Sequence, residues 1–553
     1  MARHWRVAAI VAAVLVGLPL LVCVLLLVLG NTDRGRRLIE AATEHFSRGR
    51  VVLQGLDGRF PDHLRLERLE IRDPQGTWLD AEQLQLDWSP LPMLGKNLKA
   101  SHLQAARVAM ERQPHYPPSV PPHPFRGLWL HSLRIDDIQI ERGELGAALV
   151  GKRVALRLSG SADIHSWEQA QAQLTAQRLD EVPAVYRAST HLDGTHVQGQ
   201  LEVDEDAEGP MAHLIRLPDL GALAVHLQID GPRSAVKAQL SARGGPLQAK
   251  IDGTLDLLER SAALQVSLDA PAMSPRPDLS WRGLALHGYW NGTLAAPVTS
   301  AQLTLAGLAE GPVHLDALNA TLSGEGSALS LQAALTGLLL PNSSGGSVLS
   351  HAPVQLHAEG YLADPQRPVY FTLSHPLLTV TNGRWNIGGP ASLTATLNDL
   401  APLAAQAKLD LKGRGSVQLK LYAQSAIRRL DVLGDLQIRG GEPRLTRLFG
   451  PQTRFNATLA FKNTGTEIER SQLTAPKAQV SLRGRALPRA LDLNFKAALP
   501  DLAALSPALG GTLSGSGELQ GAAPALTLTA EVDGKVWAHG TSPGPIHLSL
   551  RAH

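Results

Sequence analysis

The sequence predicts an all-β protein in which an amino-terminal transmembrane helix precedes an elongated, curled, antiparallel-type β-sheet with few short helices. Three observations support this fold class. Apolar and polar residues alternate along most of the chain, turn residues recur every ~8–12 positions, and one long apolar stretch lies at the start. Alternation with a period of two places apolar side chains on one face of a strand and polar side chains on the other.

The first element is the apolar stretch Val7–Leu29, which contains no charged residue. A helix rises ~1.5 Å per residue, so this stretch is long enough to cross a hydrocarbon core of roughly 30 Å. A cleaved signal peptide would have a shorter apolar run ending in small residues, whereas bulky side chains here persist to Leu29. We therefore predict that residues 1–30 form a cytoplasmic stub and an uncleaved, single-pass anchor that includes Val7, Leu15, Leu20 and Leu29.

The next segment, residues 31–113, is expected to open with a short helix and to continue into the first strands. The helix is predicted over residues 31–45, with Thr32 or Asp33 as its N-cap. Residues 114–124 are rich in proline and therefore cannot pair as a central strand. We interpret them as a loop.

The remaining residues, 125–553, are predicted to form a repetitive β-groove. Clear alternation occurs at 223–230, 264–269 and 417–421, and Asp-Gly turns such as Asp252-Gly253 separate strands. Segments of the Leu-Pro-Asp-Leu type recur from residues 217, 397 and 499. Loose repeats of variable spacing are typical of stacked, elongated architectures.

Composition narrows the classes of function. The chain has 52 Lys and Arg against 50 Asp and Glu, without a basic stripe, so nucleic acid is not an expected partner. The single cysteine, Cys23, lies in the predicted anchor, which leaves no disulfide or thiolate metal site elsewhere. Only 4% of the residues are aromatic although 44% are hydrophobic. A wide interior would therefore be hard to fill with side chains alone.

The sequence contains no recognisable catalytic, cofactor or metal motif, so we predict that the protein is not an enzyme and holds neither cofactor nor metal. Phosphate-binding, dinucleotide-binding, nucleophile-elbow and zinc-protease patterns are all missing. The acidic cluster Asp204-Glu205-Asp206 with Glu208 lacks the glycine and the further ligand of a calcium loop. We interpret this cluster as a solvated turn and His226 as a solvated side chain.

The stretches 51–62, 73–79, 86–90 and 286–297, with the Leu-Pro-Asp-Leu-type repeats, resemble the TamB family (translocation and assembly module), which is similar to AsmA-like proteins. This resemblance implies a single-pass inner-membrane protein of a Gram-negative bacterium, with most of the chain in the periplasm. It implies phospholipid transport along an apolar groove, or help in outer-membrane protein assembly and secretion with an outer-membrane barrel of the TamA type. The carboxy-terminal domain of that family is not recognisable, so we expect the chain to be truncated before it.

The apolar face of the predicted sheet could line an open groove or fill a closed core. Alternation alone favours a closed core, because packed cores are commoner than lipid grooves. The anchor and the family resemblance favour the groove. The alternative is a closed β-solenoid that serves as an envelope scaffold or adhesin without lipid transport. The residues predicted to line the groove and shelter acyl chains are Leu223, Val225, Leu227, Ile229, Val417, Leu419 and Leu421.

Overall fold

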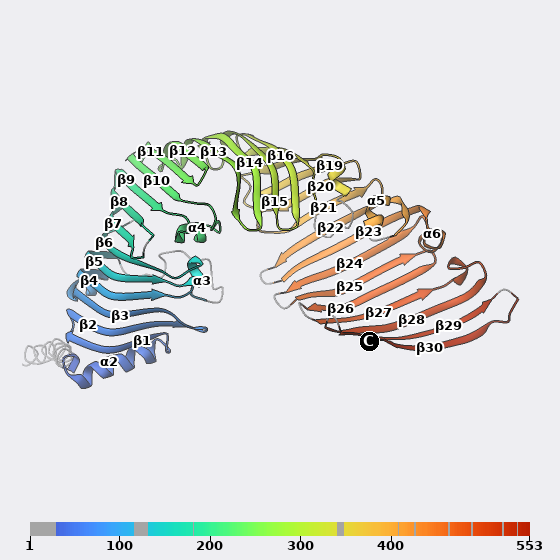
Figure 1. Ribbon diagram of the computed structural model, residues 1–553, viewed down its shortest axis with the longest axis horizontal. Helices are drawn as coiled ribbons and strands as arrows, with labels where there is room; N and C mark the ends of the chain where they lie inside the picture. The colour runs from blue at the N-terminus through green and yellow to red at the C-terminus, as the bar shows by residue number, and fades with distance from the viewer. Residues whose placement is uncertain are drawn as a thin grey trace, which may run out of the picture. The chain divides into compact units, whose positions relative to one another are not determined.

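The computed structural model describes the chain from residue 29 onward, with short gaps. The described residues are 29–115, 131–166, 168–180, 182–339, 348–406, 409–424, 427–462, 465–487, 490–522, 525–538 and 540–552. They divide into two compact units, Met1–Ser280 and Trp281–His553. Strands dominate both units, as the alternation predicts (Figure 1).

The first unit contains thirteen strands among its described residues. They are β1 (Val51–Arg59), β2 (His63–Asp73), β3 (Gly76–Ser89), β4 (Asn97–Met110), β5 (Ser132–Leu145), β6 (Val154–Ile164), β7 (Gln169–Arg178), β8 (Ala184–Asp193), β9 (His196–Glu205), β10 (Leu223–Pro232), β11 (Val236–Gly244), β12 (Leu247–Asp256) and β13 (Ser261–Arg276). Its helical elements are α2 (Asp33–Phe46), η1 (Leu91–Gly95), α3 (Ala147–Val150) and α4 (Pro210–Leu214).

These thirteen strands pair in chain order, each with its neighbours in the sequence. All the pairs are antiparallel except β4 and β5, which run parallel. The antiparallel prediction is therefore correct for the unit apart from this pair. A parallel pair needs a crossover connection rather than a hairpin, and this connection includes residues 116–130, which are outside the described residues.

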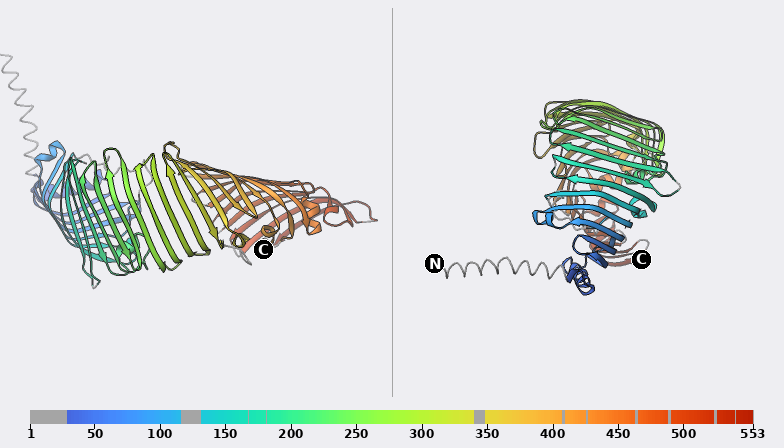
Figure 2. Two further views of the ribbon diagram at one scale, coloured as in Figure 1. Left: turned by 90° about the horizontal axis from the view of Figure 1, so that it is seen from above. Right: turned by 90° about the vertical axis from the view of Figure 1, so that its left-hand side faces the viewer.

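The second unit follows the same plan. Its strands are β14 (Leu279–Thr293), which begins at the boundary, β15 (Pro297–Glu310), β16 (Val313–Glu325), β17 (Ala328–Thr336), β18 (Val354–Tyr361), β19 (Pro368–His375), β20 (Leu378–Asn386), β21 (Ala391–Leu397), β22 (Leu411–Gln424), β23 (Ile427–Gly441), β24 (Thr453–Lys462), β25 (Gly465–Ala475), β26 (Ala478–Leu487), β27 (Ala490–Leu499), β28 (Leu509–Ala522), β29 (Ala525–Ala538) and β30 (Gly544–Ala552). The helical elements are η2 (Val348–His351), α5 (Ala401–Gln406), α6 (Pro443–Phe449) and η3 (Leu502–Ala504). From β15 to β30 the strands again pair in order and every pair is antiparallel. Figure 2 shows these strands following one another in the order of the colour bar.

Helix α2 covers the outer edge of β1, which pairs only with β2 among the described strands. Thr32 is its N-cap and accepts a hydrogen bond from Gly35 N, in agreement with the predicted helix start. Arg36 Nη2 donates to Gly58 O at 2.6 Å, and Leu56 N donates to Glu40 Oε1 at 2.7 Å. Helix side chains therefore satisfy backbone groups that would otherwise be open to another strand.

The predicted anchor lies almost wholly outside the described residues. Val7, Leu15 and Leu20 are not described, and Leu29 lies in a helical turn just before α2, with 45% of its surface exposed. None of the described helices is long and apolar enough to cross a membrane. The anchor therefore stays a prediction, as does the loop over 114–124, of which only two residues are described.

Ion pairs on the polar face join the strands around the parallel pair. Arg107 of β4 lies 2.8 Å from Glu82 Oε1 on β3 and 2.8 Å from Glu144 Oε2 on β5. Arg142 Nε also donates to Glu144 Oε1, at 2.7 Å. The Glu144 side chain is only 9% exposed, and the hydrogen bonds from Arg107 and Arg142 lower its pKa to about 2. These contacts help to hold β4 and β5 in register.

We expect Glu144→Gln to lower the free energy of unfolding at pH 7 by about 1–3 kcal/mol, because it weakens hydrogen bonds to two arginines. The lowered pKa means that the ionised Glu144 stabilises the fold above its unfolded-state pKa of about 4.3. That stabilisation disappears as the pH falls towards about 2. Denaturant unfolding at pH 7 and at acidic pH should therefore show the two proteins converging in stability.

Glu141→Gln is the matched control, since Glu141 is exposed on the same strand. This variant should stay within about 0.5 kcal/mol of the parent protein. A stability difference for Glu144→Gln that did not change with pH would contradict the role assigned to its charge.

Candidate functional site

The most extended feature of the first unit is a continuous apolar face that crosses the strands. Two rows of directly paired residues run from β1 to β13, and all their members are apolar side chains, glycines or Tyr186. Row A consists of Leu56, Leu66, Leu84, Ala105, Ile140, Leu158, Ala176, Tyr186, Val203, Val225, Ala242, Ala249 and Leu268. Row B consists of Gly58, Leu64, Leu86, Leu103, Ile138, Gly160, Leu174, Ala188, Leu201, Leu227, Leu240, Ile251 and Val266.

The second unit carries a row of the same kind. Row C consists of Leu303, Ala320, Ala333, Leu356, Leu373, Val380, Ala395, Val417, Gly434, Phe455, Leu473, Val480, Ala497, Gly515, Val532 and Leu548. Leu419 and Leu421 lie beside it on β22, where they pair with apolar residues of β21 and β23. The first unit therefore has an apolar face from β1 to β13, and the second unit has one from β15 to β30.

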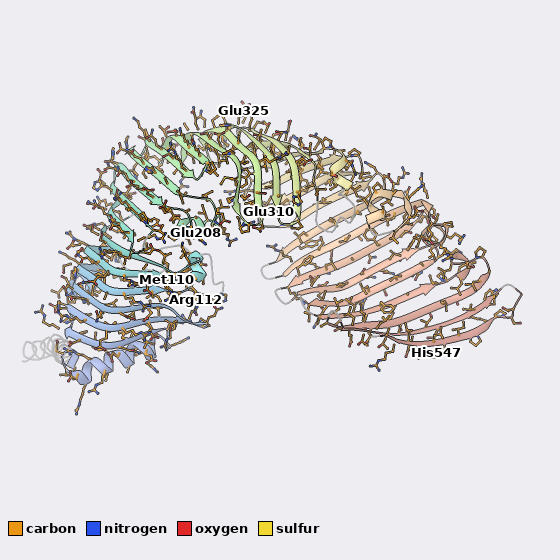
Figure 3. The ribbon with its side chains drawn as sticks, viewed as in Figure 1. Met110, Arg112, Glu208, Glu310, Glu325 and His547 are labelled. Carbon is orange, nitrogen blue, oxygen red and sulfur yellow. The ribbon has the colours of Figure 1, made fainter. Side chains whose placement is uncertain are left out.

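The opposite face is polar along the same strands. Next to row B, one cross-strand row consists of Glu202, His226, Ser241, Lys250 and Ser267. Another consists of Gln200, Gln228, Gln239, Asp252 and Gln265. Side chains project from both faces of the strands in Figure 3. One layer of strands thus offers an apolar surface on one side and a polar surface on the other.

The apolar face is only half covered. Val225, Leu227, Ile229, Val417 and Leu419 are all half-buried rather than buried. Other members of row B are more open, with Leu174 exposed by 45% and Leu201 by 36%. The facing side chains of a closed β-sandwich would instead be buried against a second layer. The face is therefore an apolar surface that is still accessible.

The buried clusters of the described residues lie where short helices pack against the sheet. One contains Val150, Val154 and Leu156 beside α3, and another contains Leu448, Ala475, Ala478 and Ala504 beside α6 and η3. A third contains Val203, Leu220 and Leu223, with Met211 of α4 packed against it. Leu223 is only 6% exposed. Among the seven residues predicted for the groove, Leu223 thus belongs to packed core, whereas the other six are half-buried.

The acidic cluster at the end of β9 is split between the two faces of the sheet. Asp206 is exposed just beyond the strand, in keeping with a solvated turn, and Asp204 is exposed but lies within β9. The interpretation is wrong for Glu205, which is 2% exposed. Neighbouring residues of an extended chain point to opposite faces, and Glu205 takes the apolar side. It accepts hydrogen bonds from Tyr186 Oη at 2.7 Å and from Ala212 N at 3.0 Å. Burial of the Tyr186 hydroxyl raises its pKa, and the hydrogen bond to Glu205 raises the pKa further.

Sequence reasoning missed Glu205 because its role depends on contacts from outside its own strand. Its carboxylate also accepts from Met211 N at 3.2 Å, so it satisfies backbone donors in the first turn of α4. Pro210 at the start of that helix was the one available signal, since proline favours the first helical turn. We assign Glu205 a structural role in holding α4 against the strands.

The described residues offer little else that suggests chemistry. No group of three or more His, Cys, Asp or Glu among them is placed to hold a metal ion. The hollows of the described residues include two of about 690 and 490 Å³, which are lined mainly by polar-face residues such as Gln200, His226 and Lys496. A twisted sheet is saddle-shaped, so both of its faces are concave along one diagonal. We therefore place the candidate site on the apolar rows rather than in these polar hollows.

Comparison with known proteins gives one family. A model of the YdbH-like family, described as intermembrane phospholipid transport protein YdbH, matches residues 20–550. No curated protein and no solved structure matches the chain. The match spans both compact units and therefore rows A, B and C. It supports the expectation of an AsmA-like bridge that carries phospholipid, whereas the narrower assignment to TamB is not confirmed.

The difference in burial between Leu223 and Leu227 predicts different costs for the same substitution. We expect Leu223→Asp to lower the free energy of unfolding by at least about 3 kcal/mol, because it buries an unpaired carboxylate in a packed cluster. Leu227→Asp and Leu419→Asp should each cost less than about 2 kcal/mol, since water can still reach these half-buried positions. Denaturant unfolding of the three variants would measure this order. Equal, large losses would indicate a closed core.

Proposed function

Because the chain belongs to the YdbH-like family of intermembrane phospholipid transport proteins, we propose that its apolar face carries the acyl chains of phospholipids from one membrane towards another. The family transports lipid, so the protein is not an enzyme. The observation that carries the proposal is the continuity of the rows. From each strand to the next, the paired residues of rows A, B and C include no charged side chain.

The physical basis is the difference between the two ends of a phospholipid. Each Å² of acyl chain removed from water contributes about 25 cal/mol, so the tails favour the apolar rows. A charged head group would lose hydration if it were buried, which costs several kcal/mol. Tails can therefore rest on the face while head groups stay in water, provided that the face remains open along one side.

The composition of the rows suits movement better than tight binding. Leu, Val, Ala and Gly follow one another from strand to strand, and neighbouring strands lie about 4.8 Å apart. Such a surface offers similar contacts at each step, so no single position holds the lipid much more strongly than the next. Rows A, B and C carry no charged group that could select one head group over another.

The wider setting follows from the family and from the sequence. A family that bridges the membranes of a Gram-negative envelope fits a periplasmic chain with an inner-membrane anchor at Val7–Leu29. A barrel partner of the TamA type, with a role in protein assembly or secretion, stays a prediction of the resemblance. The half-open face argues against the alternative of a closed scaffold or adhesin, because such a protein would gain from covering its apolar residues.

Photocrosslinking tests the proposal in cells. A photoreactive amino acid at Leu227 or Leu419 should capture phospholipid, because both side chains lie on the apolar face. The matched positions Gln228 and Gln418 are next to them in sequence but on the polar face, and should capture little. Equal labelling of the two faces, or no lipid at any of the four positions, would contradict the proposal.

Charge substitutions give a second, functional test. Leu227→Asp and Leu419→Asp should reduce phospholipid transfer strongly while the protein stays folded, because a carboxylate interrupts the apolar row. Gln228→Asp and Gln418→Asp introduce the same charge on the polar face and should leave transfer near the parent level. Normal transfer by the two leucine variants would show that these rows are not the route.

A further inference from the structure

Helix α2 and the turn after it leave large apolar side chains and arginines exposed, which together are called its free side. Leu38 is 69% exposed and Phe46 is 85% exposed. Exposed arginines lie beside them in the helix, at Arg34 and Arg37, and in the turn that follows, at Arg48. A helix with apolar and basic residues on its free side is typical of helices that lie in a membrane interface.

The two sides of α2 have different uses. On the packed side, Arg36 is 2.5 Å from Asp57, and Glu40 accepts a hydrogen bond from the backbone of β1. Both side chains therefore help to hold α2 against the sheet. On the free side, no acidic side chain of the described residues pairs with Arg34, Arg37 or Arg48. The contrast indicates that these outward arginines have no role in holding the helix on the sheet.

We propose that the free side of α2 binds the surface of an anionic phospholipid bilayer, with Leu38 and Phe46 among the head groups. The basic residues of this side would contact phosphates, and each basic residue near such a surface strengthens binding by about fivefold. They are Arg34 and Arg37 in the helix, and Arg48 and Arg50 between the helix and β1, all of them exposed.

The charge balance of the free side agrees with an anionic surface as its partner. Asp33 and Glu44 are also exposed on this helix. Four arginines against two carboxylates still leave a positive surface, which is complementary to anionic lipid.

Helix α2 lies next to the first residues of rows A and B, where lipid would enter. Glu40 accepts from the backbone of Leu56, the first residue of row A, and Arg36 donates to Gly58 O, the first residue of row B. A bilayer bound to α2 would therefore lie beside the start of both apolar rows. This last step rests on the proposed function, whereas the binding of α2 to a bilayer does not.

Fluorescence quenching tests the contact directly with the full chain. Cys23 is replaced by serine, and a single cysteine at Leu38→Cys carries an environment-sensitive fluorophore. The protein is reconstituted into nanodiscs of phosphatidylcholine, with or without phosphatidylglycerol, that contain a nitroxide-labelled lipid as quencher. We expect strong quenching at position 38 in the anionic nanodiscs, and little at the control site Gln228→Cys on the polar face of β10.

Charge reversal separates electrostatic binding from simple proximity to the anchor. Arg34→Glu with Arg37→Glu should lower the apparent affinity of α2 for the anionic surface by more than about tenfold. Quenching at position 38 would therefore decrease. Arg157→Glu with Arg243→Glu changes the net charge equally on exposed polar-face positions and should leave it unchanged. Quenching that is equal at positions 38 and 228, or that does not depend on phosphatidylglycerol, would overturn the proposal.

Lipid capture at Leu227 provides an independent reading of the proposed function. If the charge-reversed α2 loses bilayer contact but photocrosslinking at Leu227 still captures lipid, the transport proposal stands and α2 governs only docking. If α2 contacts the bilayer but Leu227 captures no lipid, the docking proposal stands and the transport proposal fails.

Discussion

The register between neighbouring strands is the constraint on which the rest of the structure depends. A slip of one residue in any pair would move every side chain of the following strand to the opposite face. Rows A, B and C exist because this slip does not occur along them. Even the parallel pair keeps the rows, since Leu103 faces Ile138 and Ala105 faces Ile140. The ion pairs of Glu144 with Arg107 and Arg142 join the strands at this point, on the opposite face.

Stability in such a protein is distributed along the ladder of strands rather than concentrated in a core. Row residues are often small, as Ala176 and Gly160 are, and most of the face is only half-buried. The buried clusters are small and lie where short helices pack against strands. Each strand therefore depends chiefly on its two neighbours, which is the energetic pattern of repeat proteins. An accessible apolar face is compatible with a stable fold because each strand from β1 to β13, and each from β15 to β30, is hydrogen-bonded to its neighbours in the sequence.

The strands and their two faces could be predicted from the sequence because alternation is a local signal. The stretch predicted at 223–230 lies within β10, and the helix expected at 31–45 is α2 with Thr32 as its N-cap. The parallel pairing of β4 with β5 could not be predicted, because pairing depends on residues distant in sequence. The burial of Leu223 and Glu205 was missed for a related reason. Both depend on a short segment around α4 whose few residues give no periodic signal.

The nearest-neighbour pairing of strands has a consequence for how such a chain could diverge. Removing one strand would reverse the direction of every strand that follows it. Removing a hairpin of two strands would instead leave the following strands with their original direction and with the same side chains on the apolar face. Gains and losses of whole hairpins would therefore preserve the apolar rows while changing the number of strands. The parallel β4 and β5 pair is an exception within the described ladder, since no single hairpin spans it. Variation in related chains should thus avoid this junction and accumulate in the antiparallel stretches on either side.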